Sequence, residues 1–426
     1  MLVVGAGYVG LATAVFFARK GHTVTVLEKK SELVSQLRKG VLHFHEPALL
    51  VNLKIALRAG KLIIEKPARE FYQAAEYVFV AIDSADRQTW RMNLRPFRQI
   101  ARWLGSEKPR RRQIVVMKST NILGSAEKFD QLLKKTPYGE YIDVAVSPEF
   151  LREGHAWEDT ADPWRIVVGA ESKQAVAKLA RLYRSVYRKS IPIITDGWKT
   201  AELIKLASNL YLAHRLAYIN EVAEFARMEG MDVDLVKSGI SRDPRIGGGY
   251  FEPGLGFAGA CLPKDCRFIN VSYNKKHFKF HTAETALKIN ELVVDGVVGR
   301  IRKRLGGLRG KKVALLGTAF KPETDDTRES QALKLAARLR RMGAKVAAYD
   351  PLVRPVEGKA GGKLDYAETA EDAVRGASIV VIGTAHDSFR KLRPASLKRL
   401  MKQPVVCDNF RILRRAGWEK QGFEFV

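Results

Sequence analysis

The chain has 426 residues, enough for two or three domains of ordinary size. It is 46% hydrophobic and 28% charged, and no apolar run approaches the ~18–20 residues that cross a bilayer, so we expect a soluble, globular protein outside the membrane. Lysine and arginine total 73 against 46 acidic residues, a net charge of +27 that raises the question of nucleic-acid binding. Because the basic residues are scattered and no RRM, KH or zinc-knuckle pattern accompanies them, we expect instead a basic surface that attracts anionic ligands.

The N-terminal region predicts a βαβ unit. Residues 2–6 form an apolar run, a glycine turn follows, residues 11–19 have helical spacing, and residues 23–27 form a second apolar run. No basic leader precedes this pattern, so we expect no signal peptide. Further strands are predicted at 77–82, 113–118, 143–147 and 166–169. Alternating strands and helices predict a parallel, doubly wound sheet.

The glycine turn, Gly5-Ala6-Gly7-Tyr8-Val9-Gly10, matches G-x-G-x-x-G between a strand and a helix. The first glycine allows the tight turn, the second lets the backbone approach a pyrophosphate, and the third lets helix and strand pack closely. Glu28 ends the second strand, where a carboxylate accepts hydrogen bonds from a ribose diol and repels a 2′-phosphate. The pattern predicts NAD in preference to NADP.

Two acids follow the strand predicted at 143–147, in Pro148-Glu149-Phe150-Leu151-Arg152-Glu153-Gly154. Strand ends of this kind line ligand crevices in open α/β sheets, although a surface loop with two solvated acids fits the residues equally well.

The middle of the chain is helical. Residues 199–227 contain no glycine or proline and carry apolar residues at helical spacing, and residues 282–305 form a second long helical stretch. Lys205 and Asn209 are four residues apart and therefore share one face, where an ammonium and a carboxamide can stabilise an oxyanion. Ordinary helix surface is the alternative for this pair.

The chain contains three cysteines, Cys261, Cys266 and Cys407, which excludes a disulfide scaffold, fits a reducing compartment and predicts a cytoplasmic location. Cys261 lies in the glycine-rich segment 256–265, where a substrate can come close to a nucleophilic thiol. A small buried cysteine is the alternative. No further histidine or cysteine pair completes a zinc site, so we expect no metal.

A basic, glycine-bearing stretch at 302–312 precedes a second α/β region. A helix is predicted at 332–341, and strands are predicted at 313–316, 345–350, 378–383 and 404–408. The plan is therefore α/β, then helical, then α/β.

Together these motifs resemble the UDP-glucose/GDP-mannose dehydrogenase family over almost the whole chain. The resemblance rests on GAGYVGLATA, Lys118-Ser119-Thr120, SPEFLREG, AELIKLASNLYLAHRLAYINE, CLPKD and LGTAFKPETDDTRES. It implies a Rossmann-like NAD domain at 1–197, a central helical dimerisation domain at 198–300, and a UDP-sugar domain at 301–426. It also implies a homodimer and a four-electron oxidation of a nucleotide sugar.

The resemblance also implies roles for single residues. Cys261 would be the nucleophile, Lys205 would stabilise the oxyanion beside Asn209, Asp265 and Thr120 would organise a water, and Glu153 would be the general base. The implied NAD contacts are Gly5, Gly7, Tyr8, Val9, Gly10, Glu28, Lys29, Ser84, Thr120, Glu153, Lys264 and Arg328. The implied sugar contacts are Glu149, Phe150, Leu151, Lys205, Asn209, Arg245, Tyr250, Gly256, Phe257, Cys261, Phe320 and Lys321, with Arg245 reaching across the dimer.

Four segments depart from the family pattern. Ile82-Asp83-Ser84-Ala85 replaces Val-Pro-Thr-Pro, Asn121-Ile122 replaces Val-Pro, and Ala258 replaces glycine. After Asp408-Asn409, Phe410-Arg411 stands where the family has Arg-Asn after Asp-Gly, which puts one sugar contact in doubt.

The acidic motif followed by Ala161-Asp162-Pro163-Trp164-Arg165-Ile166-Val167 resembles the UDP-glucose branch of the family, with UDP-N-acetylmannosamine or GDP-mannose as alternative substrates. A non-catalytic protein that binds nucleotides or nucleic acid is the alternative from another class.

Overall fold

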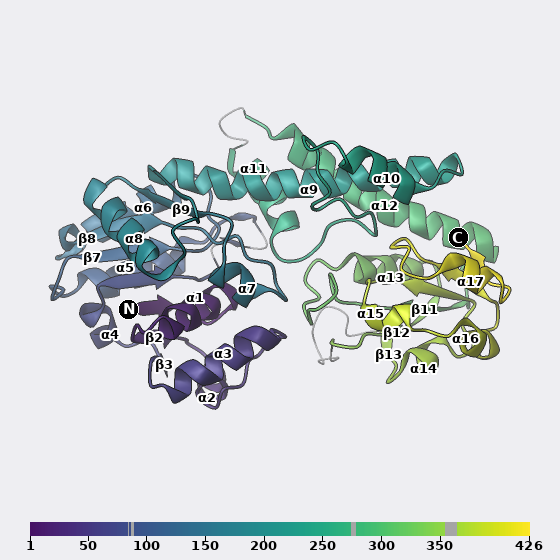
Figure 1. The fold of residues 1–426 in the computed structure, drawn as a ribbon, viewed down its shortest axis with the longest axis horizontal. Helices are drawn as coiled ribbons and strands as arrows, with labels where there is room; N and C mark the ends of the chain where they lie inside the picture. The colour runs from purple at the N-terminus through teal and green to yellow at the C-terminus, as the bar shows by residue number, and fades with distance from the viewer. Residues whose placement is uncertain (84, 87–88, 274–277, 354–363) are drawn as a thin grey trace. The chain divides into compact units, whose positions relative to one another are not determined.

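The computed structural model describes residues 1–83, 85–86, 89–273, 278–353 and 364–426. The chain divides into two compact units. One contains Met1–Ser208, and the other contains Asn209–Asn270 and the described residues from 278 to 426. Each unit contains one large sheet, and long helices occupy the middle of the chain, so the predicted α/β class with two doubly wound sheets is confirmed (Figure 1).

The first unit contains an eight-stranded sheet in the order β10-β9-β8-β7-β4-β1-β2-β3. Its strands are β1 (Leu2–Val4), β2 (Val24–Leu27), β3 (Leu62–Glu65), β4 (Tyr77–Val80), β7 (Gln113–Met117), β8 (Ile142–Val146), β9 (Ile166–Ala170) and β10 (Ile193–Asp196). Beside it are the two-stranded hairpin β5 (Ala85–Asp86) and β6 (Arg91–Met92), and the short 3₁₀ helix Gly139–Tyr141. Its helices are α1 (Tyr8–Arg19), α2 (Ser31–Arg38), α3 (Pro47–Arg58), α4 (Arg69–Ala74), α5 (Leu94–Gly105), α6 (Ser125–Lys134), α7 (Ala156–Ala161) and α8 (Lys173–Val186).

One strand pair of this sheet corrects the prediction of a wholly parallel sheet. β9 runs antiparallel to β8, with Val146 opposite Gly169, whereas β8 and β7 are parallel. The chain leaves β8, forms only the short helix α7, and enters β9 beyond the carboxyl end of β8. No crossover helix spans the sheet face there, so the strand returns in the opposite direction.

The candidate cofactor segments leave one edge of this sheet. β2, β1, β4, β7 and β8 are consecutive parallel neighbours in the sheet. Their carboxyl ends lead into Glu28, Gly5, Ile82, Lys118 and Ser147, respectively. Because parallel strands end at the same edge, four segments that are distant in sequence lie at the same edge of the sheet as the glycine turn.

The second unit contains a parallel, six-stranded sheet in the order β13-β12-β11-β14-β15-β16. Its strands are β11 (Lys312–Leu316), β12 (Lys345–Tyr349), β13 (Asp365–Tyr366), β14 (Ile379–Ile382), β15 (Val405–Cys407) and β16 (Glu424–Phe425). Its helices include α10 (Val233–Ser241), α12 (His281–Leu305), α13 (Gln331–Arg341), α14 (Ala370–Val374), α15 (Asp387–Arg390), α16 (Pro394–Leu400) and α17 (Arg415–Glu419).

Alternating side chains of β11 divide between two cores. Val313 and Leu315 belong to one apolar cluster, together with residues of α12 and α13. Ala314 and Leu316 belong to another, together with residues of α14 and α16. This two-residue period buries both faces of the sheet, as a doubly wound arrangement requires.

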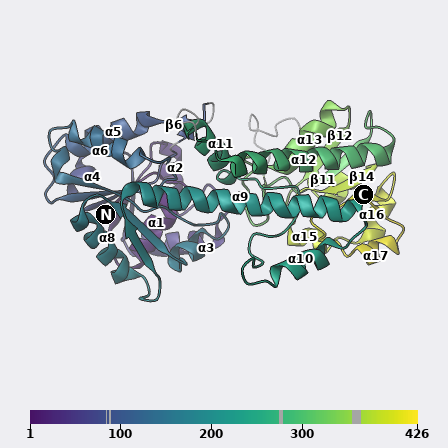
Figure 2. The same ribbon diagram turned by 90° about the horizontal axis from the view of Figure 1, so that it is seen from above.

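The two longest helices match their predicted positions. α9 spans Trp198–Met228, against a prediction of 199–227, and α12 begins at His281 and ends at Leu305, against 282–305. The later part of α9 and α12 lie side by side (Figure 2), and Arg300 of α12 contacts Glu224 of α9 at 2.8 Å. Among the described residues, no helix is long and apolar enough to cross a membrane.

Candidate functional site

The candidate residues fall into two groups, one in each compact unit. The glycine turn, Thr120, the acidic motif and Lys205 belong to the first unit. Asn209, the segment containing Cys261, and the candidate cations near Lys321 belong to the second.

The three motif glycines are required for different reasons. Gly5 has φ +105°, and a Cβ on it would lie 2.4 Å from the Ala81 carbonyl oxygen. A Cβ on Gly10 would lie 2.0 Å from the Gly5 oxygen. A Cβ on Gly7, in contrast, would meet nothing within 4 Å. The fold itself therefore demands Gly5 and Gly10, whereas the bare backbone at Gly7 suits the close approach of a ligand.

The N-terminus of α1 fits the pyrophosphate of NAD. Gly7 is its N-cap, with no side-chain capping bond and no acidic residue in the first turn. Its first amides and the helix dipole therefore favour an anion. Glu28, at the end of β2, accepts a hydrogen bond from the Lys30 amide at 3.0 Å, and Lys29 is exposed. The residues present fit a dinucleotide.

The acidic motif contains a nearly buried ion pair. Lys205 Nζ lies 2.9 Å from Glu149 Oε1, and the two side chains are 5% and 10% exposed. The Leu151 amide donates to the other Glu149 oxygen at 2.8 Å, while the Phe150 ring lies beneath Lys205 and Arg165. Glu149 thus fixes the ammonium group of Lys205, a contact for which the sequence offered no local signal.

Glu46 supports the other end of the motif and was not predicted. It is 2% exposed, and its two carboxylate oxygens accept hydrogen bonds from the amides of Gly154 and Ala156 at 2.5 and 3.2 Å. These bonds orient the turn immediately after Glu153. Since Glu46 is 108 residues from Gly154, no short motif could have linked them.

The segment after β7 is held by a second buried acid. Thr120 is 8% exposed, and Glu202 accepts hydrogen bonds from the amides of Gly124 and Ala126 at 2.6 and 2.9 Å. Burial raises the pKa of Glu202 to about 7. Burial also lowers the pKa of Lys118 to about 8, although Glu149 opposes that change. Ser84, a predicted NAD contact, lies outside the described residues, and the neighbouring Asp83 is exposed.

Cys261 is exposed and immediately precedes α11 (Leu262–Tyr273). The Asp265 amide donates to its carbonyl oxygen at 2.8 Å. A helix N-terminus stabilises a thiolate. Cys266 and Cys407 are buried, and burial raises their thiol pKa values to about 12 and about 11. The three thiols therefore differ in reactivity, and Cys261 is the one suited to nucleophilic attack.

The carboxylate of Asp265 is fully buried and lies one turn into this helix. One oxygen accepts a hydrogen bond from Asn209 Nδ2 at 2.6 Å, and the other pairs with Lys264 Nζ at 2.6 Å. Three predicted residues are therefore brought together beside Cys261 within the second unit.

The backbone before Cys261 is fixed by polar side chains. Asn290 accepts from the Phe257 amide at 2.7 Å and donates to its carbonyl oxygen at 2.9 Å, and Gln331 donates to the same oxygen at 2.9 Å. Gly256 has φ +101°, and a Cβ there would lie 2.2 Å from Asn290 Oδ1. Phe320 packs against Gly259 so closely that a Cβ on this glycine would lie 2.8 Å from the ring.

The remaining candidates are cationic or aromatic. Lys321 follows Phe320, with its ammonium 5.9 Å from that ring, and Arg328 Nε lies 2.7 Å from Asp326. Arg245 is 87% exposed and pairs with Asp243 of its own loop, while Tyr250 is 40% exposed with φ +56°. The reach of Arg245 across a dimer stays a prediction.

Family models match three successive parts of the chain. The NAD binding domain of the UDP-glucose/GDP-mannose dehydrogenase family matches residues 1–187, its central domain matches residues 199–292, and its UDP binding domain matches residues 314–415.

Individual relatives match nearly end to end. The chain is 33% identical to UDP-glucose 6-dehydrogenase YwqF of Bacillus subtilis, covering 95% of this chain and 92% of that protein. It is 32% identical to UDP-glucose 6-dehydrogenase of Rhizobium meliloti, covering 100% and 98%. A UDP-glucose dehydrogenase structure from Pyrobaculum islandicum aligns with TM-score 0.90 at 34% identity, covering 98% and 95%. A UDP-D-ManNAc dehydrogenase structure from Pyrococcus horikoshii aligns with TM-score 0.87 at 27% identity, covering 100% and 98%.

Proposed function

The chain belongs to the UDP-glucose/GDP-mannose dehydrogenase family as an NAD-dependent nucleotide-sugar dehydrogenase, and from this premise we propose that it oxidises UDP-glucose to UDP-glucuronate. The observation that carries the chemistry is the exposed Cys261 at the start of α11, beside the Asn209–Asp265–Lys264 network. The names of the relatives from Bacillus subtilis and Rhizobium meliloti support UDP-glucose as the substrate.

The proposed reaction has a covalent stage on the protein. NAD, when bound, supplies the hydride acceptor for two successive oxidations. The alcohol first loses a hydride from its carbon and its hydroxyl proton to water, which gives an aldehyde. The Cys261 thiolate then adds to the carbonyl carbon, forming a C–S bond and an alkoxide. Loss of a hydride from that carbon converts this adduct to a thioester. Water then attacks the thioester, the C–S bond breaks, and the carboxylate and the thiol are released.

In this proposal the other candidate residues stabilise negative charge on the intermediate or transfer protons. Lys205, oriented by Glu149, stabilises the alkoxide together with Asn209, which requires both side chains to act on the same substrate carbon. Glu153 removes a proton from the hydrolytic water, which Thr120 and Asp265 orient. Gly5, Gly7, Gly10 and Glu28, with the other predicted contacts in their loops, hold NAD.

The test is NADH release against a panel of UDP-glucose, UDP-N-acetylmannosamine and GDP-mannose. We expect UDP-glucose to have the highest kcat/KM and to yield two NADH per sugar, because the thioester route removes two hydrides. One NADH with accumulating free aldehyde would contradict the thioester. Salt-dependent DNA binding without NADH production would favour the non-catalytic alternative.

We propose three domains with the predicted boundaries, 1–197, 198–300 and 301–426, a cytoplasmic location, and a homodimer through the central domain. Tyr211, Tyr218 and Phe225 recur every seven residues along α9 and are 58%, 45% and 60% exposed. Such an apolar stripe on one helix face suits a second copy of the chain. Phe225→Glu should therefore halve the mass measured by light scattering, and an unchanged mass would exclude this face.

A further inference from the structure

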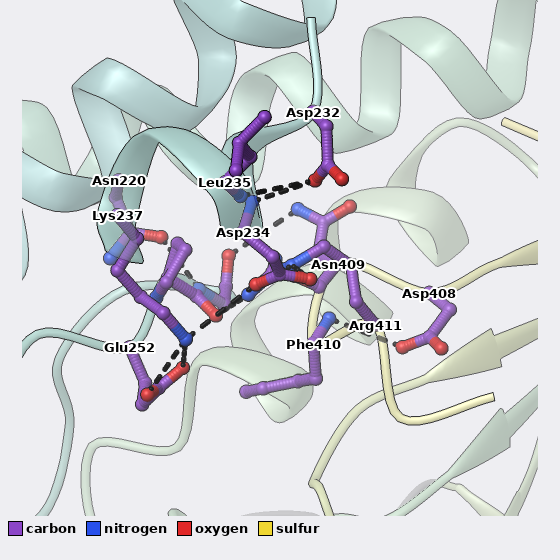
Figure 3. Close-up of polar contacts among 12 residues, drawn as sticks. Asn220, Asp232, Asp234, Leu235, Lys237, Glu252, Asp408, Asn409, Phe410 and Arg411 are labelled. Carbon is purple, nitrogen blue, oxygen red and sulfur yellow. Dashed lines mark hydrogen bonds and ion pairs between the residues drawn. The ribbon is translucent and has the colours of Figure 1, made fainter. Parts of the chain in front are cut away.

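The loop Pro253–Phe257, here called the pre-cysteine loop, is held by side chains from separate elements of the second unit. At its start, the Gly254 amide donates to Asn220 Oδ1 of α9 at 2.9 Å. The Gly254 carbonyl oxygen accepts a hydrogen bond from Asn409 Nδ2 at 3.4 Å. One peptide is therefore bound on both sides by carboxamides that are far apart in the sequence (Figure 3).

Asn409 is itself anchored. Its side-chain oxygen accepts from Arg300 Nη2 at 2.9 Å, and Arg300 also binds Glu224 at 2.8 Å. The next residue, Phe410, packs on the loop so closely that a Cβ on Gly254 would lie 2.4 Å from its ring. The segment after β15 therefore fits the backbone of Gly254 by shape as well as by hydrogen bonding.

Arg411 completes the contact. Its Nη2 donates to the Pro253 carbonyl oxygen at 3.4 Å, and its Nη1 donates to the Asn409 carbonyl oxygen at 2.5 Å. Its Nε lies 3.1 Å from Asp234, near the start of α10 (Figure 3). Arg411 has φ +55°, a conformation that non-glycine residues seldom adopt, so surrounding contacts must compensate for its cost.

A second ion pair ties the same loop to α10. Lys237 lies 2.7 Å from Glu252, the residue before Pro253, and 3.6 Å from Asp234 (Figure 3). Arg411, Asp234, Lys237 and Glu252 thus form a continuous set of charges, which contacts the pre-cysteine loop through Arg411 and ends at Glu252, the residue before the loop. Asp234 is shared by both cations, so removing it loosens both attachments.

We propose that Asp408–Arg411 is a latch that positions the pre-cysteine loop for the nucleotide sugar, with Arg411 as a positioning residue. The far end of the loop, at Phe257, is fixed independently by Asn290 and Gln331. Releasing the latch frees the start of the loop, whose ordering then has to occur on binding. Cys261 comes after Phe257, where Asn290 and Gln331 still hold the chain, so the reactivity of its thiol is retained. This inference rests on the proposed function, which assigns Gly256 and Phe257 to the sugar site.

The test variant is Arg411→Gln, with Arg415→Gln as the matched control, because Arg415 forms an exposed ion pair with Glu419. We expect Arg411→Gln to raise the KM for UDP-glucose roughly tenfold, with kcat within about twofold and the KM for NAD unchanged. Asp234→Asn, which leaves the latch backbone untouched, should have the same effect. In the variant that combines Arg411→Gln with Asp234→Asn, the KM should rise by less than the product of the two single effects, since both substitutions break the same ion pair. An equal loss of kcat, or a change in the KM for NAD, would overturn the assignment.

A second measurement does not depend on turnover. Hydrogen exchange of amides 254–256 in the full chain should quicken in Arg411→Gln and not in Arg415→Gln. UDP alone, titrated calorimetrically, should bind the first variant more weakly than the wild type. If no nucleotide sugar yields NADH, the proposed function fails, while these two measurements still decide the latch. The latch would be refuted if Arg411→Gln left hydrogen exchange unchanged, or if it quickened exchange but left the affinity for UDP unchanged.

Discussion

The central strands of the two sheets are followed by similar glycine turns. The backbone amides after these turns differ, because a carboxylate binds them in one sheet and not in the other. Gly5 immediately follows β1 and Gly317 immediately follows β11, with φ +105° and +96°. A Cβ on either glycine would clash with the loop after the adjacent strand, at Ala81 in one sheet and Thr384 in the other. Both turns therefore occur where the strand order reverses, which is the usual ligand-binding point of an open α/β sheet.

The segments beyond these turns differ. In the first unit α1 begins at Tyr8, three residues after Gly5, and no carboxylate caps its first turn. In the second unit α13 begins only at Gln331, and the buried Asp350 accepts hydrogen bonds from the amides of Thr318 and Ala319 at 2.6 and 2.9 Å. His386 lies 3.4 Å from the same carboxylate.

This difference bears on how each sheet edge can bind an anion. The first presents backbone amides and a helix N-terminus to a phosphate. In the second, the carboxylate of Asp350 already accepts hydrogen bonds from the amides that follow Gly317, so these amides are not free to bind a phosphate. The two turns therefore differ in how their amides are bonded, and variants can test what this difference does.

The largest expected effect separates cofactor binding from covalent chemistry. Cys261→Ser should lower turnover by ~10³ or more, because a hydroxyl is a poor nucleophile near neutral pH. NAD affinity, measured by calorimetry, should be unchanged, since the glycine turn lies in the other unit. Cys266→Ala is the control, because that thiol is buried. Near-normal turnover of Cys261→Ser, or an inactive control, would refute the thioester mechanism.

The next effect concerns buried acids. Burial raises the pKa of Glu202 from 4.5 to about 7 in the folded chain, so the stability associated with its protonated form is complete below pH 4.5 and is lost as the pH rises through 7. Because glutamine does not titrate, the stability of Glu202→Gln relative to the wild type should rise by up to ~3 kcal/mol between pH 5 and 8. Urea unfolding at several pH values measures this, with the more exposed Glu127→Gln as control.

Asp350 should behave in the opposite way. Burial alone would raise the pKa of Asp350. His386, together with hydrogen bonds from the Ala319 and Thr318 amides, nevertheless lowers this pKa to about 2. Its contribution is therefore present above pH 3.8 and is lost as the pH falls towards 2. The stabilities of Glu202→Gln and Asp350→Asn, each relative to the wild type, should change with pH in opposite directions. The same direction for both would contradict this contrast between the buried acids of the two units.

A pair of glycine variants tests whether Gly7 serves the ligand and Gly10 the fold. Gly7→Ala should leave the melting temperature nearly unchanged, because its Cβ meets nothing, while weakening NAD binding ~30-fold. Gly10→Ala should lower stability by ~1–3 kcal/mol, because its Cβ overlaps the Gly5 oxygen. Calorimetry and thermal unfolding distinguish them. Equal losses of stability would mean that Gly7 is also a packing residue.

The smallest effect is cofactor choice. We expect kcat/KM for NAD to exceed that for NADP by about tenfold or more, because Glu28 repels a 2′-phosphate. Glu28→Gln should lower the ratio of kcat/KM for NAD to kcat/KM for NADP. Glu32→Gln, on the neighbouring helix α2, should leave this ratio unchanged. Equal kcat/KM values for the two cofactors in the wild type would remove Glu28 from the ribose site.

Local patterns predicted several features well. The absence of glycine and proline from 199–227, with helical apolar spacing, placed α9 within one residue at each end. The G-x-G-x-x-G turn was predicted because the spacing of its glycines, between an apolar strand and a helix, is itself a local pattern. Hydrogen bonds between neighbours along the chain dominate such elements, so the sequence nearby contains the necessary information.

The contacts that orient the candidate site were decided by tertiary structure. Glu46 binds the Gly154 amide across 108 residues, Glu202 binds Gly124 across 78, and Asn409 binds Gly254 across 155. The reversal of β9 and the buried Glu149–Lys205 pair belong to the same class. By itself the sequence determined which elements form and which residue types they present, because those depend on near neighbours. Which distant carboxylate or carboxamide satisfies a given amide depends on how the strands are ordered, and only the folded chain specifies that order.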